Sequence, residues 1–372
     1  MNGAGTWPFH GVATPVKLAP AEILNPTLRH SLSSAPMTSK QRKWLVAAIK
    51  LSIVGLLIWG VHRTLGQAYD DLRKHPLHLD LAWLVAAGGL YLLSILPSAL
   101  FWHRVLRAMG QRVGPIAAVR AYYIGHLGKY VPGKALVVVL RAGLVRGPGV
   151  SAAVAAVSVF VETLTMMASG SFLAAALIST LSQSLDLFIP ALGNKPLPFR
   201  AVAIVFMLAS GLPTLPPIFK RVIRLTRIGR ANPAAAAQLQ RIDYGTLLLG
   251  WLLTGIGWFI MGLSLTAVLR GMGQSSPGWI DGLPLTTLVV CAAVVAGFMS
   301  FIPGGLVVRD VVMLELLIRA GSTSEVAVAA TIVLRLVWLA AELVAAGVLY
   351  LIRIKPQAIA LPSTEPSNSP TP

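Results

Sequence analysis

Long apolar stretches recur along this chain, and two of them are interrupted by a Pro-Gly pair. Proline removes a backbone donor and glycine permits a sharp reversal, so each pair predicts a broken helix. In lipid, non-helical backbone is stable only where it is buried in protein or lines a wet cavity. Two such breaks, in corresponding halves of the chain, predict a central functional site. The breaks are Gly128-Lys129-Tyr130-Val131-Pro132-Gly133-Lys134 and Ser300-Phe301-Ile302-Pro303-Gly304-Gly305.

The composition is typical of an integral membrane protein. The chain is 55% hydrophobic and 12% charged, with a mean hydropathy of +0.73. Its net charge is +18, but the basic residues fall in short connections between apolar stretches, as the positive-inside rule predicts. Nucleic acid is therefore not expected as a partner. The single cysteine, Cys291, lies inside an apolar stretch and leaves the compartment open.

Three regions are expected along the chain. Residues 1–43 are polar and rich in proline and serine, which predicts a disordered cytoplasmic segment. Residues 44–355 form the transmembrane domain, and residues 356–372 form a second disordered cytoplasmic tail. Met1 and Met37 both stay open as the true start, because Met37 stands directly before a basic run and the first apolar stretch.

We expect an all-α integral membrane bundle of about six full spans, each close to the roughly 20 residues that a bilayer requires. The two broken elements, over 116–140 and 284–318, are predicted to be re-entrant helical hairpins inserted from opposite faces, which would form an inverted repeat. Full crossings in place of hairpins stay open. The predicted full spans are 44–61, 81–101, 150–181, 200–217, 245–269 and 325–352.

The distribution of basic residues predicts the orientation. The connection after the second span carries four arginines and no acid, so the N-terminus and this connection are expected in the cytoplasm, as is the C-terminus. Over 218–228, apolar and basic residues alternate at helical spacing, which predicts an amphipathic interfacial helix; a solvated basic loop is the alternative.

Charged residues within apolar stretches are the candidate functional groups, because a charge at mid-membrane costs about 2.5–3.5 kcal/mol. Lys129 and Lys134 flank the first break and are expected to bind a lipid phosphate, the alternative being that they reach the cytoplasmic head groups. Arg309 can bind phosphate through two nitrogens; alternatively it pairs with Asp310 or Glu342.

The last predicted span carries Arg335, Trp338 and Glu342 on one helical face, which is expected to point into the bundle. Glu162 and Glu342 are interpreted as counter-ions for Arg309 or Arg335, with proton carriage as the alternative. Elsewhere, Glu315 and Arg319 are expected to form an exposed pair four residues apart.

The candidate residues fall into two groups. Those expected to bind substrate are Lys129, Tyr130, Pro132, Gly133, Lys134, Pro303, Gly304, Gly305 and Arg309. Those expected to balance or couple charge are Glu162, Asp310, Arg335 and Glu342. No catalytic constellation, metal site or cofactor is predicted. His75, His78 and Asp80 are interpreted as a solvated loop.

Three stretches together are similar to those of a known family: Leu127-Gly128-Lys129-Tyr130-Val131-Pro132-Gly133-Lys134, then Glu162, then Phe301-Ile302-Pro303-Gly304-Gly305-Leu306 with Arg309-Asp310. With them the chain resembles the transmembrane region of the lysylphosphatidylglycerol synthase family, which also occurs as stand-alone flippase-like proteins. The likeness extends over about residues 43–354. Val307, Val308 and Thr163 depart from the family pattern. The resemblance implies lipid translocation in a plasma (inner) membrane, without the soluble aminoacyltransferase domain.

The expected function is a multi-pass translocase that moves an anionic or polar-headed phospholipid or glycolipid between leaflets, more a transporter than an enzyme. The alternative is a membrane enzyme, or a membrane subunit of a lipid head-group or lipid-linked glycan transferase; a passive scaffold is a third reading. Membrane lipids are the expected partners, and a separate transferase and a second copy of the chain stay open. The sequence leaves open which lipid moves, its direction, the energy source and the oligomeric state.

Overall fold

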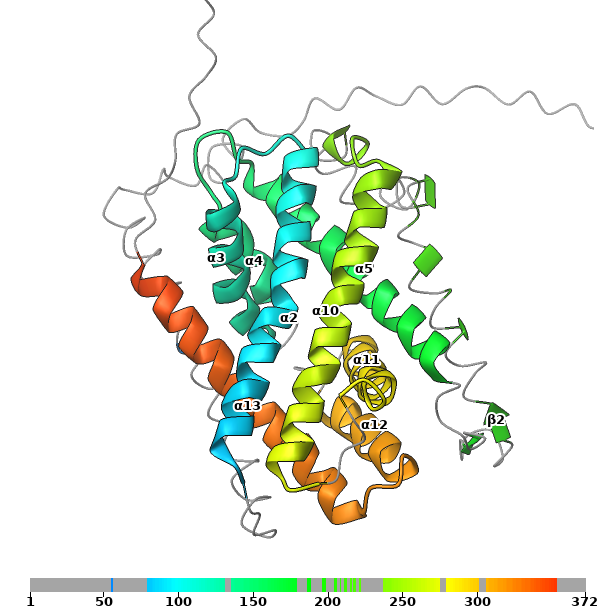
Figure 1. The fold of residues 1–372 in the computed structure, drawn as a ribbon. Coiled ribbons are helices and arrows are strands. Elements are labelled where there is room, and N and C mark those ends of the chain that lie inside the picture. Colours follow the sequence, from blue (N-terminus) through cyan, green and yellow to red (C-terminus); the bar gives the residue numbers. More distant parts are fainter. Residues whose placement is uncertain are drawn as a thin grey trace, which may run out of the picture. The chain divides into compact units, whose positions relative to one another are not determined.

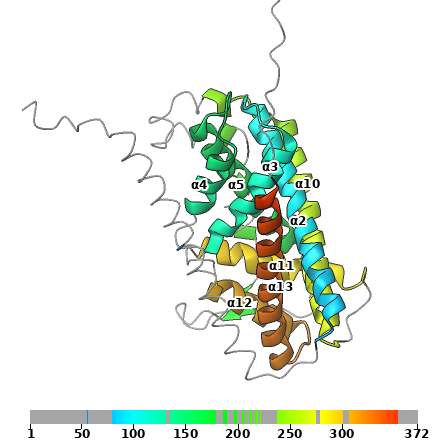
Figure 2. The ribbon, with the colours of Figure 1, turned by 90° about the vertical axis from the view of Figure 1, so that its left-hand side faces the viewer.

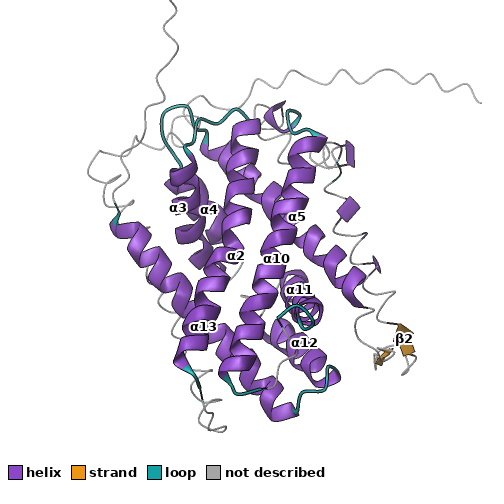
Figure 3. Ribbon diagram, viewed as in Figure 1, coloured by secondary structure: helices purple, strands orange, loops and turns teal. Residues whose placement is uncertain are grey.

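The computed structural model describes residues 79–130, 135–178, 237–274, 279–300 and 306–352, together with Gly55 and short pieces between 178 and 237. All of them lie within Val54–Pro372. The described part is helical except for one two-stranded antiparallel ribbon, β1 (Asp186–Phe188) with β2 (Pro196–Pro198) (Figures 1 and 3). The long helices are α2 (Leu81–Ala108), α5 (Ala152–Leu177), α10 (Tyr244–Gly271) and α13 (Ser324–Leu351). The shorter ones are α3 (Pro115–His126), the 3-10 turn η2 (Leu127–Tyr130), α4 (Ala135–Leu144), α11 (Leu283–Met299) and α12 (Leu306–Arg319).

Helices α2 and α10 lie side by side and antiparallel along their whole length (Figure 1). A small residue on α10 meets α2 at every seventh position: Gly250 against Phe101, Gly257 against Ser94, Ser264 against Ala87 and Gly271 against Asp80. A Cβ at Gly257 would lie 2.6 Å from the carbonyl oxygen of Ser94, so the two backbones are in direct contact there. Small residues at such spacing are how membrane helices pack closely.

The ends of the long helices follow local rules. Asp80, Asp243 and Thr323 each accept a hydrogen bond from a backbone N–H of the first turn of α2, α10 and α13. The helix that contains the predicted second span continues beyond it, to Ala108, because arginines within the last two turns do not interrupt a helix. The chain turns only at Gly110, whose φ of 73° favours glycine.

The first broken element folds back on itself. Helices α3 and α4 contact each other, and η2 contacts both. With 12 and 10 residues, the two helices are roughly 18 and 15 Å long, too short for a hydrocarbon core of about 30 Å. The reversal needs Gly128, where a Cβ would lie 2.6 Å from the backbone nitrogen of Val137. Residues 131–134, which contain the Pro-Gly pair, lie outside the described residues.

The second broken element has the same plan. Helices α11 and α12 contact each other, and α11 also packs on α5 and α10. Residues 301–305, with the second Pro-Gly pair, lie outside the described residues. At each break, therefore, the two flanking helices are neighbours in space.

Helix α13 connects the two broken elements. It contacts α12 near its start and α3 and η2 further along, and it also packs on α2 (Figures 1 and 2). Its predicted inward face is confirmed: the exposed fractions of Arg335, Trp338 and Glu342 are 7%, 4% and 2%. The surface pair is confirmed as well, with Arg319 Nε donating to Glu315 Oε1 over 2.5 Å.

Four of the described helices, α2, α5, α10 and α13, are long and apolar enough to cross a membrane. They correspond to four of the predicted full spans. The predicted span over 44–61 lies outside the described residues except for Gly55, and only isolated residues of 200–217 and of the basic segment 218–228 are described. The bundle is thus confirmed as a helical membrane domain, while the total of six spans stays a prediction.

Candidate functional site

A buried ion pair joins the first break to α13. Lys129, in η2, donates a hydrogen bond to the Oε1 atom of Glu342. Tyr91 of α2 donates to the same oxygen, and its ring stacks on Trp338 with the centroids 4.5 Å apart. The side chain of Glu342 is 1% exposed, whereas that of Lys129 is 29% exposed. The carboxylate is therefore sealed in the bundle, and its cationic partner is open on one side.

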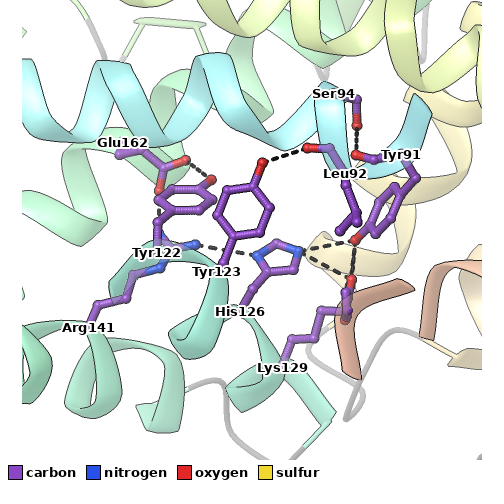
Figure 4. Close-up of polar contacts among 10 residues, drawn as sticks. Tyr91, Leu92, Ser94, Tyr122, Tyr123, His126, Lys129, Arg141 and Glu162 are labelled. Carbon is purple, nitrogen blue, oxygen red and sulfur yellow. Dashed lines mark hydrogen bonds and ion pairs between the residues drawn. The ribbon is translucent and has the colours of Figure 1, made fainter. Parts of the chain in front are cut away.

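His126 links this pair to a second cluster (Figure 4). Its Nδ1 lies 3.4 Å from a guanidinium nitrogen of Arg141, and its Nε2 lies 3.3 Å from the Tyr91 hydroxyl and 3.6 Å from Glu342 Oε1. A guanidinium has only donors, so Nδ1 must accept and Nε2 must carry the proton. This contact holds His126 as a neutral imidazole that donates toward Tyr91 and Glu342.

The second cluster surrounds Glu162 of α5. Arg141 donates to Oε2 over 2.8 Å, and the Tyr122 hydroxyl donates to Oε1 over 2.8 Å. The guanidinium carbon of Arg141 lies 3.6 Å from the centre of the Tyr122 ring and 5.7 Å from that of Trp102. The side chains of Arg141 and Glu162 are 3% and 1% exposed. Both charges of this pair are enclosed.

Asp310 of α12 is the centre of a third cluster, next to the second break. Its Oδ1 accepts two hydrogen bonds from Arg309, from Nε over 3.1 Å and from a terminal guanidinium nitrogen over 3.0 Å. Its Oδ2 accepts from Arg335 of α13 over 3.0 Å. One carboxylate thus serves two guanidiniums, which leaves a positive charge without an acidic partner among the described side chains. The Nε of Arg335 is buried and has no hydrogen-bond partner among the described residues.

Tyr130 is within electrostatic range of both the first and the third cluster. The charges of Glu342, Arg309 and Arg335 all act on its hydroxyl. The charge of Arg309 also acts on Lys129. Glu342 and Arg335 are seven residues apart on α13, or about 10 Å along the helix. Lys129, whose Nζ lies 5.2 Å from the centre of the Tyr130 ring, and Arg309 are therefore within electrostatic range of each other.

The structure corrects the predicted charge partners. Glu162 and Glu342 were expected to pair with Arg309 or Arg335, but they pair with Arg141 and Lys129. The reason is geometric: the first broken element brings Arg141 to α5 and Lys129 to α13, and Asp310 already pairs with both Arg309 and Arg335. The predicted binding residues Pro132, Gly133, Lys134, Pro303, Gly304 and Gly305 lie outside the described residues.

The sequence analysis missed four members of these clusters: Tyr91, Tyr122, His126 and Arg141. The sequence did contain a signal for Tyr122 and His126, namely their spacing. Tyr122, His126 and Lys129 follow one another at intervals of four and three residues, which places them on one helical face. Arg141, a charge next to an apolar run, carried the same signal as Lys129, whereas Tyr91 is a lone tyrosine in an apolar helix and carried none.

The comparison with protein families agrees with this arrangement. The family model described as "Lysylphosphatidylglycerol synthase TM region" matches residues 45–346. This chain belongs to that family. The match covers both breaks, all three clusters, α2, α5 and α10, and α13 up to Ala346, so the resemblance noted from the sequence is confirmed.

Membership in the lysylphosphatidylglycerol synthase TM-region family identifies a multi-pass membrane domain of a family linked to lipid handling. Comparison with curated proteins gave no match. Among the described residues, no group of three or more histidine, cysteine or acidic side chains is arranged to hold a metal ion.

Proposed function

We propose that this chain translocates a lipid with an anionic phosphate in its headgroup between the leaflets of a membrane, as a transporter and not as an enzyme. The observation that carries the proposal is that Lys129 and Arg309, beside the two breaks in an otherwise apolar bundle, are within electrostatic range of each other and of Tyr130. Their side chains are 29% and 15% exposed, while Glu342 beside them is 1% exposed. Cations that are open on one side are available to a ligand.

The chemistry favours a phosphate. Lysine offers an ammonium point charge, and arginine can bind phosphate through two nitrogens. The third cluster carries one more cation than it has carboxylates among the described residues, which suits a single negative charge. In this proposal the acyl chains stay in the bilayer, the protein lies in the plasma (inner) membrane, and both termini face the cytoplasm.

The short helices beside the breaks support a path for the headgroup. In the proposal, α3 with α4 and α11 with α12 act as re-entrant hairpins that enter from opposite faces, and α13 carries charged partners for both. Movement of one half of the repeat against the other would expose the cations alternately to the two leaflets.

The test is leaflet-resolved movement of fluorescent lipids in proteoliposomes. Labelled phosphatidylglycerol, phosphatidylcholine and a lipid-linked sugar are each tested with wild type, Lys129→Gln and Arg309→Gln. We expect wild type to move phosphatidylglycerol, and both variants to lose at least about tenfold in rate, since a lost charge-assisted hydrogen bond costs roughly 1.5–3 kcal/mol.

Arg319→Gln is the matched control, because Arg319 is an arginine of the same helix whose carboxylate partner is exposed on the surface. It should keep the wild-type rate. If wild type moves none of the lipids, the translocase proposal fails. A membrane subunit of a lipid head-group or glycan transferase then becomes the better hypothesis, which copurification of such an enzyme would support.

A further inference from the structure

We propose that Glu342 competes with the lipid phosphate for Lys129 and takes up one proton when the phosphate displaces it. Headgroup binding is then coupled to protonation at a single carboxylate. This inference rests on the proposed function, and it identifies the group through which a proton gradient would act.

If Lys129 binds a phosphate, Glu342 loses its cationic partner. Lys129 and Tyr91 both donate to Glu342 Oε1, and the carboxylate is 1% exposed. When Lys129 turns to a phosphate, an ionised Glu342 would stay buried beside a second negative charge. Burying a charge without a partner is strongly unfavourable, and such a group neutralises instead.

Among the residues that the structure describes, no other cation is placed to replace Lys129 at Glu342. His126 is kept neutral by its contact with Arg141. If His126 were protonated, its Nδ1–H would point at the positively charged guanidinium and repel it. Arg335 is committed to Asp310, about two helical turns away. A proton is therefore the remaining way to neutralise the carboxylate.

Each element packed against α13 presents a limited set of ionisable groups. Helix α10 contacts this face through Ser264, which accepts from Trp338 and does not titrate. Arg120 of α3 binds the carbonyl oxygens of Leu349 and Tyr350 instead. Within the described part of the chain, the remaining ionisable side chains are Tyr91 of α2, His126 of α3, Lys129 and Tyr130 of η2, Arg309 and Asp310 of α12, and Arg335 of α13 itself.

The charges balance in this exchange. Before binding, one ammonium group faces one carboxylate; afterwards it faces one phosphate, and the carboxylic acid is neutral. The proton comes from solvent and returns there when the lipid leaves. Tyr91 can stay bonded to Glu342 throughout, because a carboxylic acid retains an oxygen that accepts.

Calorimetry of the full chain in detergent micelles tests this directly. Dioctanoyl-phosphatidylglycerol is titrated into the protein in two buffers with different ionisation enthalpies, and dioctanoyl-phosphatidylcholine serves as the second probe. We expect about one proton taken up per phosphatidylglycerol bound, and an affinity that falls by up to about tenfold per pH unit on the alkaline side.

Glu342→Gln resembles the protonated state, so it should bind phosphatidylglycerol without proton uptake and independently of pH. Glu315→Gln is the matched control, because it removes an exposed carboxylate from α12; it should keep the wild-type proton count. The wild-type count needs no variant, so the inference stays testable if Glu342→Gln does not fold.

Three results would overturn the inference: no binding of phosphatidylglycerol, binding without protons, or an undiminished proton count in Glu342→Gln. Failure of the translocase proposal has a different readout. Wild type would then bind the lipid with proton uptake but leave it in its original leaflet in proteoliposomes. If instead lipid moves and no proton is taken up, the translocase proposal stands and the coupling is wrong.

Discussion

Two ion pairs connect the first broken element to long helices, and they differ in how exposed the cation is. In both, the acid is buried: the side chains of Glu162 and Glu342 are each 1% exposed. The cations differ, because Arg141 is 3% exposed and covered by Tyr122, whereas Lys129 is 29% exposed. A ligand can therefore reach the cation of the Lys129–Glu342 pair, but not that of the Arg141–Glu162 pair.

This difference separates two roles that look the same in sequence. Each pair consists of an acid within a long apolar helix and a base near the first break. We infer that Arg141–Glu162 fixes α4 against α5, and that Lys129–Glu342 is available for exchange with a headgroup. The four experiments below test that separation, from the largest expected effect to the smallest.

Glu162→Gln should give the largest loss of stability. It leaves the Arg141 guanidinium buried without its counter-ion, which costs about 3–5 kcal/mol in comparable buried pairs. The single cysteine, Cys291, is buried, so a fluorogenic thiol dye can follow thermal unfolding in detergent. Replacing both partners, as Arg141→Met with Glu162→Leu, should recover much of the loss. A melting temperature unchanged by Glu162→Gln would show that the pair does not hold the fold.

Gly125→Ala should disturb the enclosed pair without changing a charge. A Cβ at Gly125 would lie 2.5 Å from Arg141 Cγ and 3.3 Å from its backbone nitrogen. We expect a loss of about 1–3 kcal/mol, the usual cost of overpacking, in the same thermal assay. Gly143→Ala is the control, because no atom lies within 4 Å of the added Cβ. If the two alanine variants have the same melting temperature, α3 and α4 are not packed as described.

Lys129→Gln should have a small effect on stability and a large one on lipid movement. Its side chain is partly solvated, and Tyr91 still donates to Glu342 after the substitution. We expect a smaller loss of stability than that of Glu162→Gln, because the unpaired Glu342 can take up a proton whereas the Arg141 guanidinium cannot lose one, together with the loss of transport predicted above. Thermal unfolding and lipid movement are measured on the same preparation. Equal destabilisation by the two variants would remove the distinction between the pairs.

The smallest effect is expected at Asp243, which provides a pH reference outside both pairs. Hydrogen bonds from Thr246 lower the pKa of this exposed carboxyl below its usual value of 3.8. The carboxylate therefore stabilises the fold fully above the usual pKa, and this contribution is lost as the pH falls through the lowered value.

Asp243→Asn keeps a capping side chain but removes the titration. Its melting temperature should depend less on pH than that of wild type in the acid range, below about pH 4. Asp281→Asn, which removes an exposed carboxylate before α11, is the control. A variant with the wild-type acid profile would show that the cap does not contribute.

Much of the helical plan was predictable. The predicted spans 245–269 and 325–352 correspond to α10, Tyr244–Gly271, and α13, Ser324–Leu351, because apolar length and a capping residue are local properties. Helix α2 continues past the predicted span 81–101 to Ala108, since arginines near the end of a helix do not terminate it. The ribbon of β1 and β2 was not predicted.

The candidate site was predictable only as a set of residues. Lys129, Arg309 and the buried acids were found because charge in an apolar stretch is costly wherever it lies. The alternative pairing of Arg309 with Asp310 is confirmed. The predicted partners of Glu162 and Glu342 were wrong, because an ion pair between distant segments depends on which helices become neighbours. Glu342 and Lys129 are separated by 213 positions, and no periodicity within either helix carries that information.

The sequence by itself determined a helical membrane domain of the lysylphosphatidylglycerol synthase TM-region family, two breaks, and the inward face of α13. These follow from hydropathy, from backbone chemistry and from helical periodicity, each of which acts over a few residues. Only the tertiary structure decided that Arg141 is enclosed by Tyr122 and Glu162, and that Lys129 shares Glu342 with Tyr91. Packing places charges from distant segments within hydrogen-bonding distance, and the exposure that remains on one side separates a structural ion pair from an exchangeable one.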